Sequence, residues 1–278
     1  MGQSPSLRRV RFAISGWVGL LCLAGCAWVG TERASLPELN TVARGQLVFH
    51  SDFALPSNHR LLEELTARRS DLEERLGLPL SDEPIHVYLF DSPEEFREFV
   101  RARHPDFPSR RAFFLETDTR LQVYAQWGDR LAEDLRHEVT HGYLHSVVSD
   151  VPLWLDEGLA EYSEAPRGQH GLNRDHLKYL VPQIRQGVWQ PDLVRLERLA
   201  PSRDLTQAQY AESWAWAHFL LETRPERAAA LRDFLAALRQ KGSAEPLSAR
   251  LVRIDADPSQ ALVAHVQAMG EAIAVKQD

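Results

Sequence analysis

Two histidines and two glutamates stand at spacings that suit a metal ion with a catalytic base beside it. His137 and His141 are four residues apart, Glu138 lies between them, and Glu157 follows after fifteen intervening residues. On a helix, residues four apart lie one turn above each other, so both imidazoles point to the same side and can hold one ion. Glu138 lies about 100° around the helix, which places its carboxylate beside the ion rather than on it.

Two histidines and one glutamate form a ligand set that is typical of catalytic zinc, which keeps its fourth position open for water. His137, His141 and Glu157 would supply this set for one Zn²⁺ ion. Water on such an ion has a pKa of about 7, so Glu138 can deprotonate it while the metal polarises a substrate carbonyl. The residues therefore predict hydrolysis of amide bonds with Glu138 as general base. A structural zinc is disfavoured, because such sites are usually closed by cysteine and histidine.

The flanking residues predict two helices that position this set. Asp129 suits the N-cap of the first helix. Apolar residues then recur at a spacing of four and form a stripe beside the histidines: Leu131, Leu135 and Val139. We expect this helix to end within residues 146–149, and a second helix that carries Glu157 to begin at residues 150–152. The alternative is an amphipathic helix with two surface histidines whose spacing has no chemical meaning.

With these motifs the chain resembles the gluzincin zinc metallopeptidases, the thermolysin-like and aminopeptidase N-like enzymes in which a glutamate on a second helix follows an HExxH helix. It looks most like bacterial lipoprotein families with a peptidase-MA-like domain, which pair HExxH with a segment similar to Pro152–Tyr162. The resemblance covers residues 40–240. It implies a zincin-like α+β fold, zinc ligation by the three residues named above, and general acid/base catalysis by Glu138.

The resemblance also implies roles for Glu161 and Tyr210. Thermolysin-like enzymes carry a carboxylate four residues after the metal glutamate, where it orients a ligand histidine, and Glu161 has that spacing. Aminopeptidase N-like enzymes use a tyrosine on a later helix to stabilise the oxyanion, and Tyr210 precedes a comparable apolar segment. Two alternatives stay open, an exposed Glu161 and a Tyr210 that only packs on Trp214. We expect His145 at the surface or in contact with a ligand.

One feature of aminopeptidase N-like enzymes is missing from the sequence. No Gly-x-Met-Glu-Asn segment, which holds the free amino terminus of their substrate, precedes the metal helix. We therefore expect an endopeptidase that acts on a peptide or protein substrate. The alternative function is a catalytically inactive zincin-fold lipoprotein that serves as a binding or scaffold module.

The amino terminus predicts export and a lipid anchor. Three arginines among the first eleven residues precede an apolar stretch over residues 12–24, which is the layout of a secretory signal peptide. The stretch leads into Leu-Ala-Gly-Cys, which resembles the lipobox of bacterial lipoproteins, with Cys26 as the lipidated residue. We expect a lipoprotein signal peptide over residues 1–25 and a membrane-anchored protein of the bacterial cell envelope, with the outer membrane favoured.

Three other interpretations fit this terminus less well. The first is an ordinary cleavage site in which Cys26 is incidental. The others are N-myristoylation, for which Gly2 and Ser6 fit the pattern, and a twin-arginine signal at Arg8 and Arg9. An apolar export-type stretch argues against myristoylation, and Arg11 stands where a twin-arginine signal prefers an apolar residue.

Charge and cysteine content limit the partners and the ligands. The chain has 278 residues and a formal net charge of −7, which becomes −10 when residues 1–25, with three arginines and no acids, are removed. We expect no nucleic-acid partner, because such proteins carry a basic footprint. The second cysteine, Cys22, lies inside the predicted signal peptide, so the mature chain has no free thiol for a disulfide or for zinc.

The rest of the chain predicts a short tether over residues 26–45 and one metallopeptidase domain over residues 46–278. Within the domain we expect an α/β lobe at 46–149 and a helical lobe at 150–278. Strands are predicted at 46–53, 85–90, 112–115 and 121–125, with a helix at 58–76 between the first two. Later helices are predicted near 172–187, 206–223, 225–241 and 258–275.

Two further expectations concern the sheet and the helical lobe. The strand at Leu121–Ala125 is the candidate for an edge that binds an extended substrate by β-addition, and an ordinary central strand is the alternative. Trp214, Trp216 and Phe219 are expected in the core rather than in a ligand site.

Overall fold

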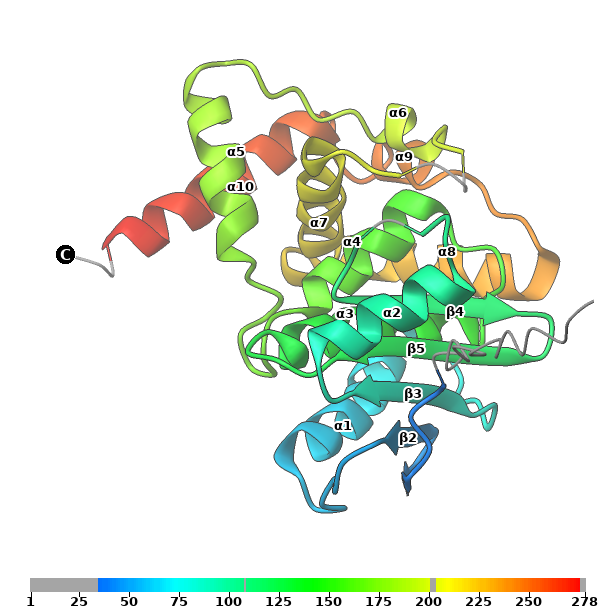
Figure 1. Ribbon diagram of the computed structural model, residues 1–278. Coiled ribbons are helices and arrows are strands. Elements are labelled where there is room, and N and C mark those ends of the chain that lie inside the picture. Colours follow the sequence, from blue (N-terminus) through cyan, green and yellow to red (C-terminus); the bar gives the residue numbers. More distant parts are fainter. Residues whose placement is uncertain (1–34, 108, 201–203, 276–278) are drawn as a thin grey trace, which may run out of the picture. The chain divides into compact units, whose positions relative to one another are not determined.

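A computed structural model describes residues 35–107, 109–200 and 204–275. In these residues a five-stranded sheet comes first along the chain and a mostly helical region follows (Figure 1). The predicted α+β class is confirmed. The predicted signal peptide and Cys26 lie outside the described residues. None of the described helices has the combination of length and apolar composition that crossing a membrane requires.

The sheet has the strand order β1-β2-β3-β5-β4. Its three central strands are parallel to one another, namely β2 (Leu47–Ser51), β3 (Ile85–Phe90) and β5 (Arg120–Gln126). The two edge strands, β1 (Asn40–Arg44) and β4 (Ala112–Thr117), pair antiparallel with their neighbours. Parallel pairing requires a crossover, and the long helix after β2 provides the first one.

The strand at 121–125 is not an edge strand, so that prediction is wrong and its alternative, a central strand, is confirmed. It lies in β5, which pairs with β3 on one side and with β4 on the other. The edge strand beside the metal helix is β4. Strand order depends on long-range pairing, which the local pattern of apolar residues does not encode.

Residues 40–44, which the sequence pattern assigns to the tether, form β1 instead. This short strand is only partly buried and has no run of apolar residues. A tight turn at Gly45, whose φ of +57° lies in the left-handed region that glycine adopts readily, folds it back onto β2. Backbone pairing therefore holds β1 in the sheet, and such pairing has a weak signal in the sequence.

Helices cover both faces of the sheet. On one face α1 (Arg60–Leu76) and α3 (Leu131–His145) pack on alternate residues of the central strands in the main core. On the other face lies α2 (Pro93–Arg103), which was not predicted. An aromatic cluster holds α2 in place and consists of Tyr88, Phe90, Phe96, Phe99, Phe113 and Tyr124.

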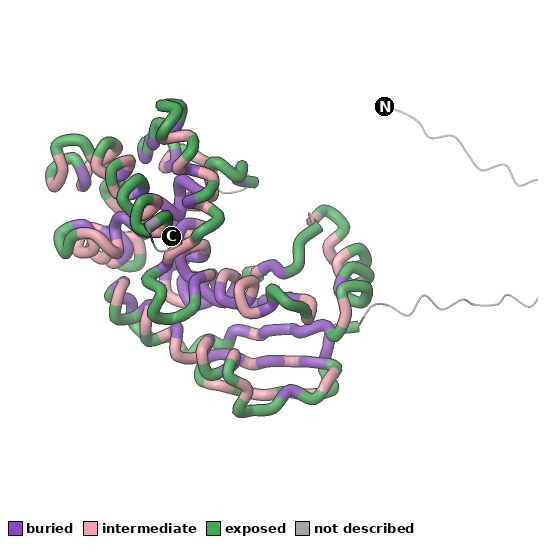
Figure 2. The backbone as a smooth tube through the Cα atoms, turned by 90° about the vertical axis from the view of Figure 1, so that its left-hand side faces the viewer, coloured by how far each residue is buried: buried purple, intermediate pink, exposed green. Residues whose placement is uncertain are grey.

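The helical region begins with α4 (Leu153–Ser163) and continues with α5 (Arg174–Arg185), α7 (Gln207–Glu222), α8 (Pro225–Lys241) and α10 (Pro258–Val275). These helices agree with the predictions to within a few residues. Two short helices were not predicted, α6 (Leu193–Glu197) and α9 (Leu247–Leu251). Figure 2 shows buried residues continuing from the central strands into the adjoining helices.

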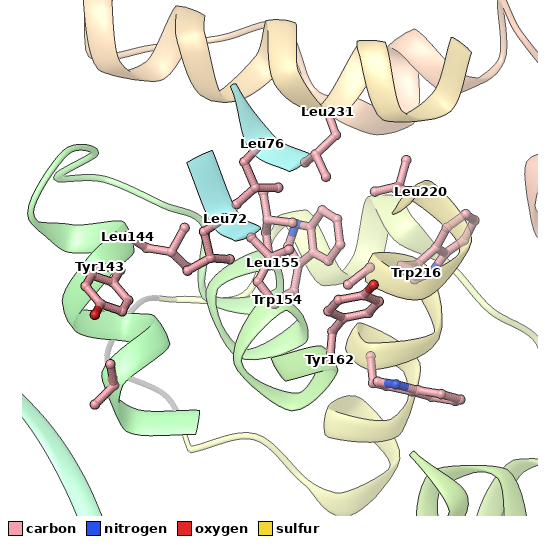
Figure 3. Close-up of a cluster of buried hydrophobic side chains, with 14 of the residues drawn as sticks. Leu72, Leu76, Tyr143, Leu144, Trp154, Leu155, Tyr162, Trp216, Leu220 and Leu231 are labelled. Carbon is pink, nitrogen blue, oxygen red and sulfur yellow. The ribbon is translucent and has the colours of Figure 1, made fainter. Parts of the chain in front are cut away.

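The core of the helical region is rich in tryptophan. Trp154 of α4 and Trp216 of α7 are almost fully buried. Trp154 lies near Leu72 and Leu76 of α1 and Trp216 lies beside Leu220, so one cluster joins the two parts of the fold (Figure 3). Trp214, Trp216 and Phe219 were predicted as core residues and are 0%, 0% and 1% exposed. That prediction is confirmed.

Two glycines next to the predicted ligands allow close packing of the helices that carry them. A Cβ added at Gly142 would lie 2.9 Å from Ile85 Cγ2, so α3 sits tightly on β3. A Cβ added at Gly158 would lie 2.5 Å from the backbone oxygen of Ser213, so α4 and α7 touch backbone to backbone. This second contact brings the segment around Tyr210 near to Glu157.

Candidate metal centre

Helix α3 is held in place by the apolar stripe expected from the sequence. Leu131, Leu135 and Val139 are 4%, 0% and 0% exposed and face the sheet. The helix begins at Leu131 with Arg130 as N-cap, one residue later than expected. Because the histidines flank this stripe, they project from the buried side of α3 toward α4.

The three predicted ligands come together. Glu157 Oε2 lies 3.3 Å from His137 Nε2 and 3.8 Å from His141 Nε2. The side chains of His137 and Glu157 are each 14% exposed, and that of His141 is 7% exposed. The ligand atoms of His137, Glu138 and His141 also lie within 4.8 Å of one another. These residues can hold a metal ion.

The spacing of these atoms fits tetrahedral zinc. Zinc binds histidine nitrogen and carboxylate oxygen at about 2.0–2.2 Å, so two ligands of one tetrahedron are about 3.4 Å apart. The two distances to Glu157, 3.3 and 3.8 Å, lie close to this value. The donor set contains nitrogen and oxygen atoms only, as is common for catalytic zinc.

Each ligand histidine has a carboxylate at its second ring nitrogen. Glu164 Oε1 lies 3.1 Å from His137 Nδ1, and Asp156 Oδ1 lies 2.9 Å from His141 Nδ1. Such partners fix the tautomer and the orientation of a metal-binding imidazole and raise its basicity. The Nε2 atoms of both rings are thereby directed toward Glu157. Sequence reasoning identified neither Glu164 nor Asp156 for this purpose.

Glu161, predicted to orient a ligand histidine, lies in the same cluster but has a different nearest partner. Its Oε2 is 2.8 Å from His176 Nε2. Its ligand atom also lies within 4.8 Å of those of His137 and Glu164. Asn173 donates to both carboxylates, at 3.4 Å to Glu161 and 3.0 Å to Glu164. The carboxylate in direct contact with His137 Nδ1 is therefore that of Glu164, one turn later on the chain.

His145 extends the site along α3 in contact with Asp156. Its Nε2 lies 3.1 Å from Asp156 Oδ2, and its Nδ1 lies 2.6 Å from Glu116 Oε2 on strand β4. Burial lowers the pKa of His145, but these two carboxylates outweigh it and raise the pKa to about 9. His145 is therefore largely buried rather than at the surface, and it contacts Asp156, the partner of His141, rather than a predicted ligand itself.

Glu138 faces a pocket of about 300 Å³ that is also lined by His137, Glu161 and Tyr210. The residue is 8% exposed. Burial raises the pKa of the Glu138 carboxyl, while the nearby His137 and His141 oppose this rise. A carboxylate beside the ligands that opens to a pocket is placed to exchange protons with a molecule bound there.

Tyr210, in the first turn of α7, lies on the wall of the same pocket. Burial and the neighbouring Glu157 carboxylate raise the pKa of Tyr210 to about 12. Its hydroxyl is therefore protonated at neutral pH and can donate a hydrogen bond. A capping box formed by Thr206 and Gln209 fixes the start of α7 just before this residue.

The pocket also contains a residue that sequence reasoning missed. Arg110, in the segment that leads into β4, lines the pocket together with Glu138 and Tyr210. It lies 100 positions before Tyr210 and in no recognisable motif, so nothing in the local sequence connects it with the metal residues.

A family model described as a protein of unknown function (DUF1570) matches residues 132–247. This segment runs from the second residue of α3 to the first residue of α9 and leaves out the sheet. It contains the three candidate ligands, Glu138 and Tyr210. No match to a curated protein was found.

Proposed function

We propose that this protein is a zinc-dependent peptidase of the gluzincin type. The observation that carries the proposal is the convergence of His137 Nε2 and His141 Nε2 on Glu157 Oε2, at 3.3 and 3.8 Å, with Glu138 beside them. This set provides three ligands and a separate carboxylate, which is what a hydrolytic zinc site requires.

The arrangement of the fold supports a zincin-like architecture. A sheet whose antiparallel edge strand β4 lies beside the metal helix precedes α3, and α4 follows with the third ligand. Strand β4 lies beside the site, since the ring of Phe114 stacks on His141 at a centroid distance of 5.9 Å. An extended peptide paired with the free side of β4 would pass along the metal site.

The proposed reaction divides the work between the zinc and four side chains. Zinc, when bound, supplies a Lewis acid that polarises a carbonyl and lowers the pKa of water to about 7. Glu138 accepts the proton of the attacking water and passes it to the leaving amine. Tyr210 donates a hydrogen bond to the oxygen of the scissile carbonyl as negative charge develops on it. Glu164 and Asp156 keep the two histidines in position throughout.

The substrate is proposed to be a peptide or protein cut at an internal bond. The pocket opens to the surface beside an edge strand, and an extended chain can enter such a site from either end. The wall contributed by the segment before β4 carries Arg110 and Arg111 and no carboxylate. The carboxylates of the opposite wall, Glu161 and Glu164, are engaged by neighbouring side chains, and the sequence lacks the Gly-x-Met-Glu-Asn segment that would bind a free amino terminus.

The proposed location is the bacterial cell envelope, with a lipid on Cys26. This part of the proposal rests on the sequence of the first 26 residues, which lie outside the described structure. Metabolic labelling with palmitate tests it. Label in the wild type and none in Cys26→Ser is expected, and equal labelling of both would contradict the anchor.

The experiment for the peptidase function measures zinc content and casein cleavage in four proteins. These are the wild type, Glu138→Gln, Glu157→Ala and, as a control, Glu63→Gln, which changes an exposed glutamate of α1. We expect one zinc per chain and activity in the wild type and the control. Glu138→Gln should keep zinc and lose activity, and Glu157→Ala should lose both.

Two results would contradict the proposal in different ways. Wild-type protein that binds zinc but cleaves neither casein nor a broad peptide library would favour the inactive binding or scaffold protein. Wild-type protein that binds no zinc would remove the metal from both functions.

A further inference from the structure

Arg110 is a positively charged side chain at the mouth of the proposed catalytic pocket. It lines this pocket with Glu138 and Tyr210, and its own side chain is 41% exposed. Burial acts to lower the pKa of Arg110, but the neighbouring Tyr210, Glu157 and Glu138 outweigh it and raise the pKa. The guanidinium is therefore close to the groups that would act on a bound peptide.

The next residue, Arg111, shows by contrast that Arg110 is open to a ligand. Arg111 donates two hydrogen bonds to the carboxylate of Asp134, at 2.9 and 2.7 Å, and this fork holds its guanidinium in place. The partner of Arg110 among the described residues is Asp204, with a single contact of 3.4 Å. Asp204 is 82% exposed, and such surface pairs contribute little and are readily exchanged.

The carboxylates on the opposite wall have their own partners. Glu164 contacts His137 and accepts from Asn173, and Glu161 contacts His176. These contacts leave the guanidinium of Arg110 as the group in this pocket best placed to bind an anion. A guanidinium forms two parallel hydrogen bonds with a carboxylate, which gives such a contact both strength and direction.

We propose that Arg110 binds a carboxylate of the substrate and makes the enzyme prefer peptides that carry one near the scissile bond. The carboxylate belongs either to an Asp or Glu side chain or to the carboxyl terminus of a short substrate. This inference rests on the proposed peptidase function for its substrate, and it assigns Arg110 to specificity rather than to the chemical step.

The first experiment compares cleavage of matched peptides by the full-length, zinc-loaded protein. Cleavage sites are first located in casein peptides by mass spectrometry. Peptides covering these sites are then made in pairs, with Asp or Asn beside the cut bond and with a free or an amidated carboxyl terminus. For Arg110→Met we expect kcat/KM to fall about tenfold or more for the member with the decisive carboxylate and to stay unchanged for its neutral partner.

Two further variants sharpen the comparison. Arg110→Glu should reverse the preference toward peptides with lysine in the same position, because the sign of the charge is reversed. Arg239→Met, at an exposed position near the end of α8, is the matched control and should leave the preference unchanged. If Arg110→Met slows cleavage of the Asp peptide relative to the Asn peptide, Arg110 binds a side-chain carboxylate. If it slows cleavage of the peptide with a free terminus relative to the amidated one, Arg110 binds the carboxyl terminus.

The second experiment measures binding without catalysis. Zinc-loaded Glu138→Gln is titrated in a calorimeter with acetylated alanine pentapeptides that contain one Asp or one Asn, each with a free or an amidated terminus. We expect the peptides with a carboxylate to bind more tightly than the neutral ones. This difference should disappear in the double variant Glu138→Gln/Arg110→Met. Equal binding of both kinds, or an equal loss of activity on both kinds with Arg110→Met, would overturn the inference.

The two proposals fail separately. Cleavage without any dependence on a carboxylate would leave the peptidase function intact and remove Arg110 from specificity. A carboxylate preference in binding, together with no cleavage of any peptide, would remove the peptidase function and retain the binding site.

Discussion

At the scale of single residues, the candidate site has two groups of side chains, the three candidate ligands and the carboxylates that contact them. His137, His141 and Glu157 meet because of a spacing within one helix and one reversal of the chain. Asp156, the carboxylate that contacts His141, lies in α4, and Glu164, which contacts His137, directly follows this helix. The ligand atoms depend on this second group for their direction.

Glu164 and Glu161 can be told apart by their effect on zinc affinity. Because Glu164 contacts His137 Nδ1 while Glu161 contacts His176, Glu164→Gln should weaken zinc binding about 10- to 100-fold. Glu161→Gln should weaken it less. Competition with a chromophoric chelator measures both, and a larger loss for Glu161→Gln would contradict the assignment of Glu164.

Tyr210→Phe removes one hydroxyl from the pocket and keeps the ring. Under the proposed mechanism kcat should fall on the order of 10²-fold, the usual effect of losing one oxyanion donor, while zinc content and KM change little. Steady-state kinetics on a single peptide substrate measure this. Unchanged kcat would mean that Tyr210 only packs at the start of α7.

At the scale of helices and strands, the close contact between α4 and α7 sets the distance between Glu157 and Tyr210. Gly158 makes that contact possible, since any side chain there would meet the backbone of Ser213. Helix α3 is set against the sheet in the same way at Gly142. The two glycines belong to the packing of the helices that present the ligands and take no part in the chemistry.

Gly158→Ala should destabilise the protein by about 1–3 kcal/mol, because its methyl group would lie 2.5 Å from a backbone oxygen and force the helices apart. Urea unfolding followed by circular dichroism measures the change. Gly128→Ala is the control, since a Cβ at Gly128 meets nothing within 4 Å. Equal stability of the two variants would contradict the tight contact between α4 and α7.

A histidine pair between α7 and α10 predicts how stability depends on pH. His218 Nδ1 lies 3.0 Å from His265 Nε2. Burial lowers the pKa of both histidines to about 4. The neighbouring His265 lowers the pKa of His218 further, and Arg227 does the same for His265. Glu222 opposes the shift at both. Between about pH 6.5 and pH 4 the unfolded chain therefore binds protons that the folded chain does not, and stability falls as the pH falls.

This prediction is tested by comparing wild type with His265→Gln. The free energy of unfolding, measured from pH 7.5 to pH 4.5, should decrease less steeply in the variant below pH 6.5, by up to about 1.4 kcal/mol per pH unit for each proton no longer taken up. Buried carboxylates contribute equally to both proteins and cancel in the difference. Parallel curves would show that the pair does not titrate as described.

At the scale of the whole molecule, features set by neighbouring residues could be predicted from the sequence, and contacts between segments far apart in the chain could not. The metal residues, the helices that carry them and most strands follow from spacing and periodicity. The edge position of β4, the partners of the two histidines and the presence of Arg110 in the pocket depend on which segments meet in space. The early strand β1 and helix α2 were missed because their apolar patterns are short.

The central claim is that α3 and α4 together bind one catalytic metal ion. Anomalous X-ray diffraction recorded above and below the zinc absorption edge, on crystals grown with zinc, tests it most directly. We expect one strong peak per chain within about 2.0–2.2 Å of His137 Nε2, His141 Nε2 and a carboxylate oxygen of Glu157. A peak at other residues only, or no peak at these three, would contradict the claim.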